Sequence, residues 1–302
     1  MEQVLQQLGI SLDLSFNLLF LALVWVRIMA MAAVVPFLFG KPVPRYLMVA
    51  SSLLLALYAY PALVPAAPAS LGEDLPFIFV LFLKEAFYGI LMGTVAGVIF
   101  HGFQSAGSMI DNQRGVSIAR MLIPQLGEQG SLSGNFLFQF SIVIYLAIGG
   151  HRLFFEAFFD SYTILPVLEF PVAGPGLIPM LDLMINVTGE VLYIAVQLAA
   201  PVIIAIFLAD IILGIANRVA PQINVWELGF NVKGYVGILL LFVSITMIAK
   251  QFEFYSGKSQ GYIRGLVRDL AKKPPVQPEF IAPPEEGLPK TGDSPPKVET
   301  LE

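Results

Sequence analysis

The sequence predicts an all-α, polytopic membrane protein built from about six long apolar helices or helical hairpins, with kinked and re-entrant segments. Three observations carry this prediction. Hydrophobic residues make up 57% of the 302 residues and charged residues only 13%, whereas soluble domains carry roughly 25% charged residues. The mean hydropathy is +0.77. The apolar residues also gather in long runs, which a bilayer accommodates and water does not.

Six apolar runs follow one another along the chain, at residues 14–39, 46–64, 77–100, 136–148, 187–213 and 232–249. A helix needs roughly 20 apolar residues to cross the hydrocarbon core, so five runs are long enough to span. The run at 136–148 is short, and it either gains length from its flanks or forms a re-entrant or protein-buried helix. Pro61 lies near the end of the second run and Pro201 inside the fifth, where proline removes a backbone donor and is expected to bend a helix.

The basic residues between the runs suggest an orientation. Lys41, Arg45, Arg114 and Arg120 follow the first and third runs, and none precedes the first run or lies between 65 and 76. The positive-inside rule then places the N-terminus outside and these two connections in the cytoplasm. Six crossings would leave the C-terminus outside, yet the tail carries six basic residues between 250 and 273. We therefore expect an odd number of crossings, with the short run at 136–148 as the exception, or an assembly that overrides simple topology.

Several classes of function lack support in the sequence. The net charge of −5 offers no basic surface for nucleic acid. There is no cysteine, and the two histidines, His101 and His151, form no recognisable zinc or triad pattern. We expect no metal, no cofactor and no enzymatic activity. Residues 1–13 contain no Lys or Arg, so they do not resemble a signal peptide, and we expect the first run to be retained.

Among the charged residues within the apolar runs we single out Arg27, Lys84, Glu85, Glu190 and Asp210. An ionised group near mid-bilayer costs several kcal/mol unless it is paired or hydrated. We expect these residues to pair with one another or with neighbouring subunits. An ion or proton pathway, and snorkelling to the interface, are the alternatives.

The third run carries glycine at every fourth position, at Gly89, Gly93 and Gly97. This spacing lines the glycines along one helix face, where another backbone can approach closely. The approaching helix belongs either to this chain or to another subunit.

The stretch at 101–124 is too polar to span, and it is either a surface loop or a loop that seals a pore. Soft Met and Leu side chains adapt to whatever they close upon, which suits a seal. The candidate gating residues are Ile110, Asp111, Asn112, Gln113, Arg114, Gly115, Met121, Leu122 and Pro124.

The C-terminal part divides in two. At 257–273 the apolar residues Tyr262, Ile263, Leu266, Val267 and Leu270 recur at helical spacing among basic residues, which suits an amphipathic cytoplasmic helix on a membrane or partner surface, or a short solvated helix. Residues 274–302 are rich in Pro, Glu, Gly and Lys and are expected to be disordered.

Short motifs along residues 14–250 resemble the R/T component of the export apparatus in flagellar and virulence type III secretion systems, the FliR-like family. These are Pro36 with KPVPR at 41–45; IDNQRG at 110–115 with Pro124; Gly149, Gly150 and His151; Ser161, Tyr162 and Pro166; and NRVAPQ at 217–222, which contains Asn217, Arg218 and Pro221. No single motif decides the assignment, but their order and spacing do. The DNQRG form is more similar to injectisome members than to flagellar ones.

The resemblance implies a multi-pass subunit of the bacterial inner membrane. It would assemble with the P/R-type and Q/S-type membrane subunits and the switch subunit of the same system, in contact with membrane lipid, to form an entrance portal for unfolded secreted proteins. Hydrophobic helices in such assemblies lie partly above the bilayer. The loop at 110–124 would be a plug that closes the channel.

The resemblance also implies a division of the chain. Residues 1–256 would form a helical export-gate domain, of which 1–180 resemble the larger partner subunit and the hairpin at 181–256 resembles the smaller one. The alternative from another class is an autonomous ion-coupled transporter that uses Glu190 and Asp210. It requires activity from this chain alone, and no convincing internal repeat supports it.

Overall fold

The computed structural model describes residues 14–39, 43–64, 75–116, 130–169, 177–222 and 224–271. In these ranges every regular element is a helix and no strand occurs, which confirms the all-α prediction. The helices are α2 (Leu14–Val34), α3 (Arg45–Leu63), α4 (Leu75–Gln113), α6 (Leu132–Ala147), α7 (Gly150–Ile164), α8 (Leu177–Val219), α9 (Val225–Val243) and α10 (Ile245–Ala271).

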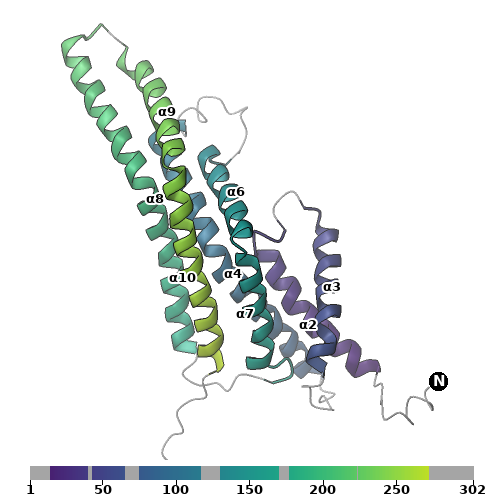
Figure 1. Cartoon of the computed structure of the whole chain (residues 1–302). Helices are drawn as coiled ribbons and strands as arrows, with labels where there is room; N and C mark the ends of the chain where they lie inside the picture. The colour runs from purple at the N-terminus through teal and green to yellow at the C-terminus, as the bar shows by residue number, and fades with distance from the viewer. Residues whose placement is uncertain are drawn as a thin grey trace, which may run out of the picture.

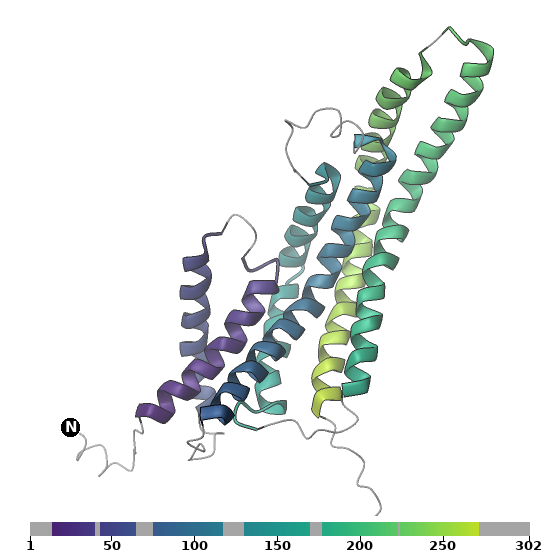
Figure 2. The ribbon, with the colours of Figure 1, turned by 180° about the vertical axis from the view of Figure 1, so that it is seen from behind.

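Helix α4 is the centre of the fold. It packs against α2 on one side and against α6, α8 and α10 on the other, and Figures 1 and 2 show it crossing the molecule between these helices. With 39 residues and a rise of 1.5 Å per residue, α4 is about 58 Å long. That is roughly twice the 30 Å hydrocarbon core, so α4 exceeds one perpendicular crossing.

The third apolar run does not end where the sequence predicted. Helix α4 continues from Phe100 through the polar stretch to Gln113, so the prediction of a loop beginning at His101 was wrong. The reason is one-sided burial: Gly102, Ala106 and Ile110 are buried, whereas His101 is exposed. A helix buried on one face tolerates polar residues on the other.

The C-terminal helices form a long hairpin whose tip projects beyond the rest of the molecule (Figure 1). Helix α8 is the first arm, and α9 followed by α10 is the second. The sequence predicted one helix at 232–249, but Ser244 separates α9 from α10. Pro201 lies inside α8 and Pro61 in the last turn of α3.

The short fourth run belongs to a broken helix pair. Helices α6 and α7 meet at an angle of 76°, and Gly149 between them adopts the left-handed conformation with φ +76°, which glycine tolerates without a steric penalty. Five described helices are long and apolar enough to span a membrane, or six if the bent pair counts as one span. This confirms a polytopic helical membrane protein, and the side on which the C-terminus lies stays a prediction.

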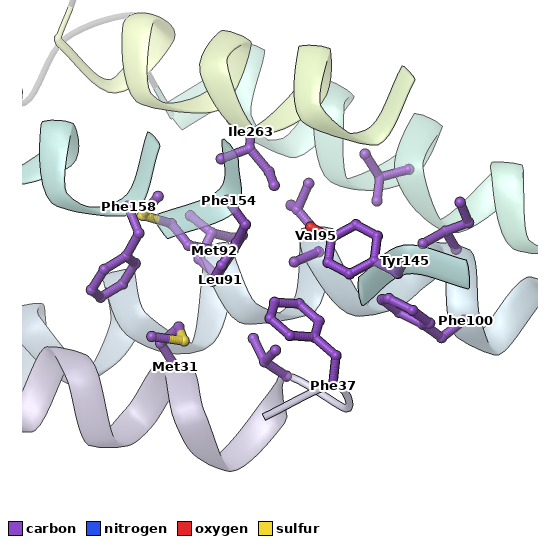
Figure 3. Close-up of a cluster of buried hydrophobic side chains, with 14 of the residues drawn as sticks. Met31, Phe37, Leu91, Met92, Val95, Phe100, Tyr145, Phe154, Phe158 and Ile263 are labelled. Carbon is purple, nitrogen blue, oxygen red and sulfur yellow. The ribbon is translucent and has the colours of Figure 1, made fainter. Parts of the chain in front are cut away.

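Aromatic side chains form the core where α4, α6, α7 and α10 meet. The rings of Phe37 and Tyr145 lie 4.8 Å apart, and those of Phe100 and Tyr145 5.2 Å apart; Figure 3 shows the three together. Phe154 joins Phe37 at 5.4 Å, and Phe252 joins Phe100 at 5.8 Å. Such pairs add to the free energy of apolar burial. Phe252 therefore ties α10 to the centre of the bundle.

The segment at 257–271 is the second half of α10. Ile263 is buried in the hydrophobic core, and Ser259 Oγ donates to Val95 O on α4 at 3.3 Å. This part of the apolar face is therefore covered by the chain itself. The side chains of Leu266, Val267 and Leu270, and all of residues 272–302, lie outside the described residues, so the expectation of a disordered tail stays a prediction.

Candidate functional site

A buried ion network joins α2 to the first half of α4. Arg27 Nε donates to Glu85 Oε2 at 2.5 Å, and Arg27 Nη2 donates to Glu85 Oε1 at 2.9 Å. Lys84 Nζ lies 2.9 Å from the same Oε1. The side chains of Arg27 and Glu85 are both 0% exposed. The forked guanidinium thus matches the carboxylate in a bidentate pair, the strongest geometry for such a contact.

The network contains two cations, Arg27 and Lys84, and one carboxylate, Glu85. Both cations also donate to backbone carbonyls that follow α7. Lys84 Nζ donates to the carbonyls of Pro166, Val167 and Glu169 at 2.9, 2.7 and 2.8 Å, and Arg27 Nη2 donates to Leu165 O at 3.0 Å. Carbonyls that follow a helix carry partial negative charge, which cations stabilise. The network therefore holds the chain after α7 against α2 and α4.

A second buried network centres on Asp111 at the far end of α4. Asp111 Oδ1 accepts from Arg114 Nη1 at 3.1 Å and from Ser133 Oγ at 2.5 Å. Its Oδ2 accepts from Ser131 Oγ at 2.6 Å and from the Ser133 backbone N–H at 2.9 Å. Ser131 also caps α6 by accepting from Gly134 N at 2.8 Å. One carboxylate thus joins the end of α4 to the start of α6.

Two glycines give this junction its shape. Gly115 ends α4 with φ +82°, a conformation typical of glycine after a helix. Gly107 lies so close to the backbone of Ser133 that an added Cβ would overlap it. Both ends of the connection at 117–129 are therefore held at one place. Of the predicted gating residues, Ile110, Asp111, Asn112 and Gln113 lie in α4, Arg114 and Gly115 follow it, and Met121, Leu122 and Pro124 lie outside the described residues.

A cavity of about 560 Å³, lined by both polar and apolar residues, lies between the end of α4 and the α8–α9 hairpin. It brings the predicted residues Asn112, Gln113, Arg114 and Gly115 together with Asp210, Asn217, Lys233 and Trp226, among others. Lys233 Nζ lies 2.6 Å from Asp210 Oδ1. Figure 2 shows the end of α4 beside this hairpin. The cavity therefore unites the IDNQRG and NRVAPQ motifs, which lie about a hundred residues apart in the sequence.

The remaining predicted charge also pairs within the chain. Glu190 Oε1 accepts from Lys258 Nζ at 2.5 Å and from Tyr262 Oη at 3.2 Å. This hydrogen bond raises the pKa of the Lys258 ammonium above its usual range. The pair therefore contributes to stability below the pKa of an ordinary lysine, about 10.4, and this contribution is lost as the pH rises through the raised value. Each of the five predicted intramembrane charges thus has an oppositely charged partner.

The other family-motif residues lie away from the cavity. Arg218 and Pro221 are exposed near the tip of the hairpin. His151 lies in the first turn of α7, and its Nδ1 is buried without a hydrogen-bond partner among the described residues. The described residues contain no group of three His, Asp or Glu side chains that could hold a metal ion.

Sequence reasoning missed Ser131, Ser133 and Lys233. Ser131 lies a few residues before the apolar run at 136–148, and serine is a typical helix N-cap, so it could have been identified. Lys233 lies at the start of the sixth apolar run and could have been counted with the other charges. Ser133 gave no signal, because its role depends on the tertiary contact with Asp111.

The predicted glycine face packs within the chain, against α2, but unevenly. A Cβ on Gly89 would overlap Arg27 O and lie 2.9 Å from Ala30 Cβ, and one on Gly93 would lie 3.0 Å from Met31 O. A Cβ on Gly97 would have its nearest neighbour, Pro36 Cδ, at an ordinary 3.7 Å.

We therefore expect Gly89→Ala to destabilise the fold by about 1–3 kcal/mol through overpacking, whereas Gly97→Ala leaves stability unchanged. Thermal unfolding of the detergent-solubilised proteins, followed by loss of the monodisperse species in size-exclusion chromatography, measures both variants. Equal midpoints for the two variants would contradict the close approach of α2 and α4 at Gly89.

The geometry defines a class of protein: a multi-pass helical membrane protein whose buried charges hold its helices together. Comparison with known proteins gives the family. The chain belongs to the bacterial export proteins, family 1, whose family pattern matches residues 18–258.

Relatives occur in both secretory and flagellar systems. The chain is 37% identical to Yop proteins translocation protein T of Yersinia pestis over 190 residues, which is 63% of this chain and 71% of that protein. It is 31% identical to flagellar biosynthetic protein FliR of Bacillus subtilis over 227 residues, 75% of this chain and 86% of that protein. It is 29% identical to surface presentation of antigens protein SpaR of Shigella flexneri over 192 residues, 63% of this chain and 73% of that protein.

These relationships confirm the FliR-like resemblance. The chain is a component of a type III secretion export apparatus and a multi-pass protein of the bacterial inner membrane.

Proposed function

We propose that this chain is a non-enzymatic subunit of the export gate, which forms with the P/R-type and Q/S-type subunits and the switch subunit an entrance portal for unfolded proteins. The observation that carries the gating part of this proposal is the Asp111 network. A single buried carboxylate binds residues on both sides of the connection at 117–129. Flanking residues that are fixed at one place keep such a connection at one end of the bundle, which suits a plug.

The exposed apolar surface supports the need for partners and lipid. On α8, Ile204, Phe207, Leu208, Ile211, Ile212 and Ile215 are 45–66% exposed. On α9, Ile238, Leu239, Phe242 and Val243 are 56–70% exposed. Apolar area on this scale is covered by lipid or by other subunits. The hairpin is the part of the chain that we propose to correspond to the smaller partner subunit, and residues 1–180 to the larger one.

The relatives favour an injectisome over a flagellar system as the setting. The identity to Yop proteins translocation protein T exceeds that to flagellar biosynthetic protein FliR, in the direction that the DNQRG form indicated. The charges that a transporter would need are Glu190 and Asp210, and both are engaged in ion pairs with lysines on facing helices. These ion pairs do not support an ion-coupled transporter.

Replacing residues 117–129 with a Gly/Ser linker of equal length tests the plug. We expect the assembled apparatus to become permeable to small ions, because a Gly/Ser linker forms a flexible coil without apolar side chains for a seal. Ion flux is measured in cells or vesicles that contain the complete membrane assembly. The control replaces the connection at 65–74 in the same way, and it should leave the membrane tight. An assembly that stays tight after the 117–129 replacement would refute the plug.

A further inference from the structure

We propose that the cavity between the end of α4 and the α8–α9 hairpin binds the backbone of an extended segment of an exported polypeptide. This inference rests on the proposed function, because it takes the exported chain as the ligand.

The charge of the cavity excludes the simplest alternative ligands. Asp210 neutralises Lys233 at 2.6 Å, and Asp111 neutralises Arg114 at 3.1 Å. Asp111 does not line the cavity, but with its charge counted, the lining residues Arg114, Lys233 and Asp210 leave no net charge to attract a phosphate, a lipid headgroup or a cation. A neutral ligand with strong dipoles fits better, and the peptide group is such a ligand.

The polar groups of the lining can both donate and accept. The amides of Gln113 and Asn217 line the cavity, and each offers an N–H₂ donor beside a carbonyl acceptor, the complement of a peptide group. Arg114 also lines the cavity, but its Nε is buried beside Gly237 of α9. The two amides therefore carry the polar recognition.

Two glycines of the lining are not required by the packing of the chain. A Cβ on Gly214 of α8 would meet no atom within 4 Å, and one on Gly229 of α9 would meet Leu213 Cδ1 at an ordinary 3.6 Å. At these two positions the missing side chains leave room for a second backbone to approach this surface closely.

Recognition of this kind is independent of side-chain sequence. Amides and glycines contact backbone, while Trp226 and Phe230 offer an aromatic edge that many side chains can contact. A partner subunit of fixed sequence would be expected to fill the cavity with complementary side chains. Exported proteins differ in sequence, so a site that binds all of them must contact the backbone, which they share. A volume of about 560 Å³ is within the range of ligand pockets.

A matched pair of glycine variants on α8 tests the close approach. Gly214→Leu places a side chain in the cavity, and Gly189→Leu places the same side chain on the same helix at a position where an added Cβ also meets nothing within 4 Å. We expect export in the assembled apparatus to fall roughly tenfold for Gly214→Leu and to stay at the wild-type rate for Gly189→Leu. Assembly and thermal stability should be unchanged in both. Wild-type export by Gly214→Leu would overturn the proposal.

Disulfide cross-linking identifies the occupant. The chain has no cysteine, so Asn217→Cys introduces a single thiol at the cavity. The probe is a substrate of the same system that carries one cysteine and is stalled by a stable C-terminal fusion domain. We expect a disulfide between Asn217→Cys and the stalled substrate, and none for Tyr58→Cys, an 83% exposed position on α3.

Two other outcomes separate this inference from the proposed function. If Asn217→Cys cross-links only to a partner subunit, or only to a second cysteine placed within 117–129, while the substrate stalls normally, the cavity is an interface and the inference fails. The export-gate function then stands. If export proceeds equally in cells that lack this chain, the proposed function itself fails.

Discussion

Glu85→Gln is expected to destabilise the folded chain by about 3–5 kcal/mol, the cost of removing one partner from a buried ion network. The glutamine leaves Arg27, which is 0% exposed, without its counter-charge in an apolar interior, and it removes the carboxylate that lies 2.9 Å from Lys84 Nζ. Carbonyls at Leu165 to Glu169 remain as partners, but they do not carry a full charge. The variant should accumulate in the membrane at a small fraction of the wild-type level, measured by quantitative immunoblotting of membrane fractions.

The matched control is Glu253→Gln, which makes the same chemical change at an exposed position of α10. Surface substitutions of this kind usually change stability by less than about 0.5 kcal/mol. We expect its membrane level to be close to wild type. Similar levels for the two variants would show that the buried network contributes no more than an exposed carboxylate.

The helices were predictable because their apolar runs are long. A run is continuously apolar where one face packs within the protein and the other meets lipid or another subunit, and five of the six runs are helices of membrane-spanning length. The extension of α4 was not predictable from composition, which becomes more polar from His101 onward. Buried residues recur at Gly102, Ala106, Ile110 and Arg114, a helical spacing that the exposed polar residues between them obscure.

The candidate site was only half predictable, for a physical reason. Asp111 and Arg114 were identified as a polar cluster, and their separation of three residues allows contact on one helix. Their partner Ser133 lies 22 residues from Asp111 in the sequence, and Lys233 lies 23 residues from Asp210 on another helix. Pairings between helices depend on packing that a local pattern does not encode, so the charges were predictable and their partners were not.

The two ion networks lie at opposite parts of the same helix, so the proposed gating can be tested separately from stability. Glu85 and Asp111 are 26 positions apart in α4, or about 39 Å at 1.5 Å per residue. The Glu85 network joins α4 to α2 and the end of α7. The Asp111 network joins α4 to α6 and holds the connection at 117–129. Loss of Glu85 should therefore lower the amount of protein, whereas loss of Asp111 should change the assembled protein itself.

Asp111→Asn is expected to make the assembled gate leak small ions. Asparagine keeps the size of the side chain but removes the charge that neutralises Arg114. Its NH₂ group also takes the place of one carboxylate oxygen, so the hydrogen bond from Ser131 or from Ser133 loses its acceptor. Breaking such a buried pair costs about 3–5 kcal/mol, enough to favour release of α6 from the end of α4 in part of the population.

Ion flux in membranes that contain equal amounts of assembled complex measures the Asp111→Asn leak. Asp160→Asn on the exposed face of α7 is the control for the chemical change and should stay tight. Glu85→Gln controls for instability and should reduce the number of complexes without opening those that form. If Asp111→Asn complexes are as tight as wild type, the carboxylate holds two helices together and does not hold a plug closed.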